Sequence, residues 1–98
     1  MNYIALFFAG AFLCNCIPHL VSGLRGDPFP SPFAKPPGKG NSSPLVNFLW
    51  GSLNLFIGLW LLPDYPVPAR LTADFAVLAL GFLLSGLFLA LHFGKVRR

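Results

Sequence analysis

The sequence predicts an all-α fold, a three-helix transmembrane bundle with a Pro/Gly-rich cytoplasmic loop. Two observations lead to this prediction. The 98 residues contain three long apolar runs, and only 10% of the residues are charged, against about 25% in soluble domains. Backbone groups in lipid must be hydrogen-bonded within their own segment, so helices are the expected spanning form. We expect residues 1–98 to form a single integral membrane domain with the lipid bilayer as its surroundings.

The three apolar runs cover residues 3–24, 45–62 and 73–93. Each is close to the roughly 20 residues that a helix needs to cross the hydrocarbon core, within a range of about 17–25. No Lys or Arg precedes the first run, and its end lacks the small-residue pattern of a signal-peptide cleavage site. We therefore expect the first run to be retained as a span.

The basic residues predict the orientation in the membrane. Six of the seven lie in two segments that three spans place on one side: Arg25, Lys35, Lys39, Lys95, Arg97 and Arg98. The other side holds Arg70. Because cytoplasmic segments are enriched in Lys and Arg, we expect the N-terminus outside and the C-terminus in the cytoplasm. These cations do not follow one face with interleaved aromatic residues, so nucleic acid is not an expected partner.

The cytoplasmic loop, residues 25–43, is rich in Pro and Gly. Its prolines remove backbone donors and favour extended geometry, so we expect no helix there. Phe29 and Phe33 give the loop apolar anchors, which we expect at the membrane interface or against the helix ends.

Capping residues mark the start of the second and third helices. Ser43 is placed to cap the second helix, with Pro44 at its first helical position. Thr72 is placed to cap the third helix, and Asp74 would lie favourably in its first turn.

The few polar and small residues fall on one face of each predicted helix by 3–4 spacing. These faces hold Ala11, Asn15, His19 and Ser22; Asn47, Gly51, Asn54 and Gly58; and Gly81, Ser85 and His92. Counted from the cytoplasmic ends, Asn15, Asn54 and Ser85 fall at one level near the middle. We expect them to form the polar core of the bundle, because small residues let helices approach and amides bond between helices.

His19, Asn47 and His92 fall nearer the cytoplasmic boundary. One interpretation is a small polar site beneath the Pro/Gly loop, since ionisable residues inside a membrane often mark function. The other is that they serve structure alone, with His92 reaching the headgroups. Lys35 and Lys39 are candidates for contact with anionic headgroups, or they set topology and nothing more.

Signals for a metal site or for catalysis are weak. Cys16 and His19 share a helical face, but a closed zinc site needs four ligands. The spans contain no deep carboxylate for proton coupling, and the aspartates and histidines lie at opposite ends, too far apart for a hydrolase triad. We therefore expect no metal, no cofactor and no catalytic residue.

One stretch carries a resemblance. HLVSGLRGDPFPSPFAKPPGKGNSSPLVNFLWGSLNL, from His19 to Leu55, resembles a segment of small, uncharacterised bacterial multi-pass membrane proteins. The resemblance implies a bacterial inner membrane location, and it implies no activity and no catalytic residue.

The sequence leaves the biochemical activity open, with three hypotheses. The first is a non-enzymatic interaction or accessory subunit that associates with itself or with a larger membrane protein, using the Pro/Gly loop as its cytoplasmic contact. The second is a small transport or channel component with Asn15, Asn54 and Ser85 along a polar path. The third is a lipid-binding protein or interfacial enzyme that uses His19, Asn47 and His92 with Lys35 and Lys39.

Overall fold

A computed structural model describes residues 2–96. The elements in chain order are α1 (Tyr3–Arg25), β1 (Phe29–Pro30), β2 (Asn41–Ser42), α2 (Pro44–Trp60) and α3 (Ala73–Val96). The described chain is thus all-helical with three helices, apart from the two-residue strands, which pair antiparallel inside the loop. Arg97 and Arg98, which contribute to the predicted charge bias, lie outside the described residues.

The helix bounds differ slightly from the predicted runs. The first helix ends one residue later than predicted. The second covers 44–60 rather than 45–62, because Pro63 disfavours helical geometry in the residue before it. The third continues to residue 96 rather than 93, since Gly94 interrupts hydrophobicity without stopping the helix.

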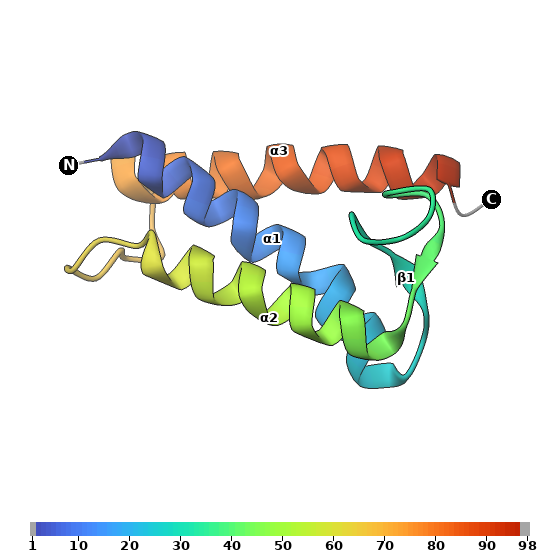
Figure 1. Ribbon diagram of the computed structural model, residues 1–98. Coiled ribbons are helices and arrows are strands. Elements are labelled where there is room, and N and C mark those ends of the chain that lie inside the picture. The colour runs from blue at the N-terminus through green and yellow to red at the C-terminus, as the bar shows by residue number, and fades with distance from the viewer. Residues whose placement is uncertain (1, 97–98) are drawn as a thin grey trace.

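The helix α1 lies between the other two (Figure 1). It packs against both α2 and α3, whereas α2 and α3 barely contact each other. The Pro/Gly loop and the end of α3 lie at one end of the molecule, and the start of α1 and the 61–72 connection lie at the other (Figure 1). The basic loop and Lys95 near the end of α3 therefore lie at the same end of the molecule (Figure 1).

Two of the helices are long and apolar enough to cross a membrane. They are α1, with 23 residues, and α3, with 24. At 1.5 Å per residue each is roughly 35 Å long, somewhat more than the ~30 Å hydrocarbon core. The helix α2 is a shorter apolar helix of 17 residues.

Close approach of α1 and α3 depends on two glycines. A Cβ added at Gly10 would collide with the Leu78 carbonyl oxygen, and one added at Gly81 would collide with the Phe7 carbonyl oxygen. The two backbones are therefore in direct contact. Such close approach lets the two helices make van der Waals contact along their backbones.

The buried side chains are both apolar, such as Leu6 and Ala9 on α1, and polar, whereas much of the surface is apolar. The buried residues of α2 are Asn47, Gly51, Asn54 and Gly58, which is the whole face that the sequence singles out. On α3 the buried residues are Asp74 and Gly81. Large apolar side chains such as Phe56 point outward.

The predicted caps are confirmed. Ser43 Oγ accepts a hydrogen bond from the Val46 N–H at 3.2 Å, and Thr72 Oγ1 accepts one from the Phe75 N–H at 3.2 Å. Each satisfies a backbone donor that the first helical turn leaves unpaired.

The connection between α2 and α3 is fastened by a side-chain hydrogen bond. The Tyr65 hydroxyl donates to Asp74 Oδ2 at 2.7 Å. Asp74 lies in the first turn of α3, where the helix dipole favours a carboxylate. The pKa of Tyr65 is raised, first because its hydroxyl bonds to this carboxylate.

We expect Gly81→Val to destabilise the protein by about 1–3 kcal/mol or more, because the added side chain must push α1 and α3 apart. Gly94→Val is the matched control, since a Cβ at Gly94 meets open space. Thermal unfolding in mild detergent measures both. Equal losses for the two variants would contradict the close approach.

We expect the Tyr65–Asp74 bond to be lost at alkaline pH. Its contribution is present below the unfolded tyrosine pKa of about 10 and disappears as pH rises through the raised folded pKa. The stability difference between wild type and Tyr65→Phe, measured from neutral pH to about pH 11, should therefore shrink. A difference that stays constant over this range would argue against the bond.

Candidate functional site

Asn47 is a hydrogen-bonding centre for the Pro/Gly loop. Its side chain is completely buried, at 0% exposure. Its Nδ2 donates toward the carbonyl oxygens of Phe29 at 2.9 Å, Ser43 at 3.1 Å and Ser42 at 3.2 Å. Carbonyl oxygens accept and never donate, so the amide can face them with its NH₂ group alone. The orientation of Asn47 is therefore fixed, with Oδ1 turned toward α1.

This orientation determines the tautomer of His19. His19 Nδ1 lies 2.8 Å from Asn47 Oδ1. Because Oδ1 accepts, Nδ1 carries the hydrogen and donates. In the neutral ring, Nε2 is then left with a lone pair, so it can accept a hydrogen bond. His19 is itself buried, with 2% exposure.

His92 fastens the loop to the end of α3. Its Nε2 lies 2.7 Å from the Gly38 carbonyl oxygen, so this nitrogen carries the hydrogen and donates. Gly38 has φ +71°, a left-handed conformation that glycine adopts without steric cost. The bond joins residues 54 apart in the chain.

A pocket of about 160 Å³ lies beneath the loop, and we call it the loop pocket. Its polar lining residues are Asn15, His19, Ser31, Trp50 and His92. The structure thus brings His19 and His92 to one pocket. Asn47 is not among its lining residues and instead holds His19 from behind. The volume exceeds the roughly 10–15 Å³ that one water needs.

Trp50 was not singled out from the sequence. Its Nε1 is buried and has no hydrogen-bond partner among residues 2–96. A tryptophan in an apolar run gives no sequence signal that it lines a pocket. Its ring also packs edge-on against Phe33, with centroids 5.2 Å apart.

Phe29 and Phe33 anchor the loop on helix side chains, as the sequence indicates. The Phe29 ring lies 5.6 Å from the His19 ring and 4.6 Å from the Phe93 ring. Phe33 packs on Trp50. The two phenylalanines therefore attach the loop to all three helices.

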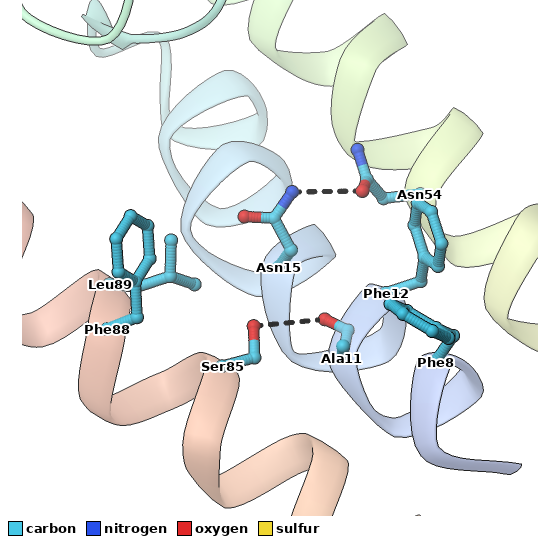
Figure 2. Close-up of a pocket in the computed structure, with 8 residues that line it drawn as sticks. All are labelled: Phe8, Ala11, Phe12, Asn15, Asn54, Ser85, Phe88 and Leu89. Carbon is cyan, nitrogen blue, oxygen red and sulfur yellow. Dashed lines mark hydrogen bonds between the residues drawn. The ribbon is translucent and has the colours of Figure 1, made fainter. Parts of the chain in front are cut away.

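The mid-depth residues gather in one cleft of about 250 Å³, which we call the central cleft (Figure 2). Asn15 Nδ2 donates to Asn54 Oδ1 at 2.9 Å, and Ser85 Oγ donates to the Ala11 carbonyl oxygen at 3.2 Å. Asn54 Nδ2 in turn donates to the Trp50 carbonyl oxygen at 2.8 Å. Asn15 Oδ1 bonds to no described residue.

The two candidate lysines separate in the structure. Lys39 lines a hollow of about 460 Å³ with His92, Lys95 and Val96, which we call the basic hollow. Lys35 is exposed and is not among its lining residues. Lys95 is three residues from His92 in the sequence, so both lie on one face of α3, but the sequence did not predict that Lys95 and Lys39 line the same hollow.

The two cysteines are free thiols buried in α1. Cys16 Sγ donates to the Leu13 carbonyl oxygen at 2.9 Å. Over residues 2–96, no three His, Cys, Asp or Glu side chains gather where they could hold a metal ion.

Comparisons with known proteins assign no family. No protein-family model, no curated protein and no solved structure matches the chain. The resemblance of residues 19–55 to bacterial multi-pass proteins therefore stays an expectation, and function must be inferred from the chain's own geometry.

We expect a double-mutant cycle on Asn15→Leu and Asn54→Leu to give a coupling free energy of about 0.6 kcal/mol, and at most ~1.7 kcal/mol, the range for interhelical bonds in membranes. Unfolding in mild detergent measures it. Ser85→Ala combined with Asn54→Leu should be additive, because these side chains do not bond to each other. Additivity of the Asn15 and Asn54 changes would contradict the bond.

Proposed function

We propose that this chain is a non-enzymatic interaction subunit that crosses a bacterial plasma membrane three times and presents its Pro/Gly loop to a partner in the cytoplasm. The observation that carries the proposal is the use of polar side chains, buried or half-buried, to hold that loop in one conformation. Asn47, His92 and the Ser31–Ser42 hydroxyl pair, 2.6 Å apart, all serve this purpose.

The surface of α3 supports insertion in a membrane. Only 6% of its apolar window is buried inside the chain, so it does not have the surroundings of a core helix in a soluble protein. Leu83, Phe88 and Leu91 are each about two-thirds exposed. A contiguous apolar surface of this extent needs lipid or protein to cover it.

A third crossing by α2 is feasible because its 17 residues meet the lower limit of about 17 for a span.

The charge distribution supports the orientation. The basic loop and the end of α3 lie together at one end of the molecule (Figure 1). The preference for Lys and Arg on the cytoplasmic side supports the proposal that this end lies in the cytoplasm.

The loop has the properties of a preorganised contact surface. A segment that is already ordered loses less conformational entropy when it binds. Phe33 is 63% exposed and yet is held against Trp50, so an apolar ring is displayed in a fixed position. The partner that fits best is a larger membrane protein with a complementary surface at the cytoplasmic boundary.

The polar side chains of the central cleft favour a structural role for the cleft over a transport role. The side chains of Asn54 and Ser85 already form hydrogen bonds within the bundle. A polar path would need such groups for the transported species.

A photoreactive amino acid at Phe33 tests the proposal in native membranes. We expect a discrete adduct with one membrane protein, at least about 5-fold reduced by Asn47→Leu, which releases the loop carbonyls, and unchanged by Asn54→Leu. The reduction corresponds to roughly 1 kcal/mol, the usual net worth of a hydrogen bond. Asn54→Leu is the matched control because it removes a buried amide that does not contact the loop.

Three results distinguish the outcomes. An adduct of the chain with itself would make the partner a second copy. No adduct, together with a monomer in mild detergent, would refute the interaction role. Equal loss in both asparagine variants would show that the loop is not the contact.

A further inference from the structure

The basic hollow collects positive charge without a matching carboxylate. Lys39 comes from the loop and Lys95 from the last turn of α3. The chain contains three carboxylate side chains: Asp27, Asp64 and Asp74. Asp27 pairs with Arg25 at 3.3 Å, and this is the one ion pair within residues 2–96. The lysines of the basic hollow therefore lack an internal counter-ion in the described chain.

His92 brings the two lysines together. Its hydrogen bond to the Gly38 carbonyl holds the loop against α3, and Lys39 is the next residue along the loop. The hollow is thus built by a side chain that bridges distant parts of the sequence. It can accommodate a group as large as a phosphate, since its volume is about 460 Å³.

The basic hollow, the loop pocket and the central cleft share lining residues in turn along α3, and we call this succession the apolar path. His92 lines both the basic hollow and the loop pocket. Phe88 and Leu89 line both the loop pocket and the central cleft, and Ser85 lies beyond them. On α3 these residues follow each other at 3–4 spacing along one face, over roughly 15 Å from Lys95 to Ser85.

We propose that this path binds an anionic phospholipid of the cytoplasmic leaflet, with its phosphate between Lys39 and Lys95 and one acyl chain along Phe88 and Leu89 into the central cleft. The proposal rests on the membrane insertion and orientation argued above. The positive charge of the two unpaired lysines complements the negative charge of a phosphodiester, and the phenylalanines of the cleft complement the apolar surface of a hydrocarbon chain.

A free phosphate would use the hollow alone. It would gain nothing from the apolar path that begins at His92 and ends beside Asn15. The junction of a basic hollow with an apolar cleft therefore favours an amphiphile. The position of the hollow at the cytoplasmic end agrees with a headgroup at that boundary.

Trp50 provides a probe for the acyl chain, because it lines the loop pocket. Trp60, which is 81% exposed, is replaced by Phe so that Trp50 alone reports. The full chain is reconstituted in phosphatidylcholine vesicles that contain a small fraction of phosphatidylglycerol with brominated acyl chains, which quench tryptophan fluorescence. We expect quenching to saturate at a low fraction of this lipid, and not when brominated phosphatidylcholine replaces it.

Charge variants test the headgroup contact. Each lysine near an anionic surface contributes a factor of about five in affinity, so Lys39→Gln with Lys95→Gln should weaken phosphatidylglycerol binding by about 25-fold. Lys35→Gln is the matched control, because it removes a loop charge outside the hollow. An unchanged affinity in the double variant, or an equal loss in Lys35→Gln, would overturn the proposal.

Two further outcomes separate the alternatives. Inorganic phosphate that competes fully at millimolar concentration, without selective quenching by the brominated chain, would make the hollow a site for a free anion and overturn the lipid assignment. A chain that fails to float with vesicles would overturn both proposals. A chain that floats without selective quenching would overturn this one alone.

Discussion

The structure depends on one buried amide, Asn47. It donates hydrogen bonds to backbone carbonyl oxygens of the loop. Its donors serve the carbonyls of Phe29, Ser42 and Ser43, and its oxygen serves His19. Carbonyls left unpaired away from water each cost about 1–3 kcal/mol. Because the side chain has no freedom to turn around, the conformation of the loop and the tautomer of His19 are set together.

The sequence was sufficient to locate the helices and the polar face of α2. Both follow from local periodicity, since the spacing of Asn47, Gly51, Asn54 and Gly58 alone determines which side of a helix they occupy. Capping by Ser43 and Thr72 was equally local. The helix ends were predicted less well. The helix α2 ends before Pro63, earlier than its apolar run, whereas α3 continues past Gly94, beyond the end of its apolar run.

The arrangement of the loop could not be predicted in this way. It arises from bonds across 18 residues between Asn47 and Phe29 and across 54 residues between His92 and Gly38. No periodicity reports such contacts. For the same reason, the predicted site grouped Asn47 with the two histidines and did not pair Lys95 with Lys39. In the structure, Asn47 lies behind the loop pocket and Lys95 lines the basic hollow.

The position of α1 explains why there is room for a site at all. Gly10 and Gly81 bring α1 against α3 in the half of the molecule away from the loop, whereas Gly23 lies against the start of α2 at the loop end. The helices α2 and α3 therefore separate toward that end. Direct packing of α2 against α3 would have filled the space between them with side chains. The loop fills it instead with short turns held by hydrogen bonds, and such a covering leaves the loop pocket and the basic hollow beneath and beside it.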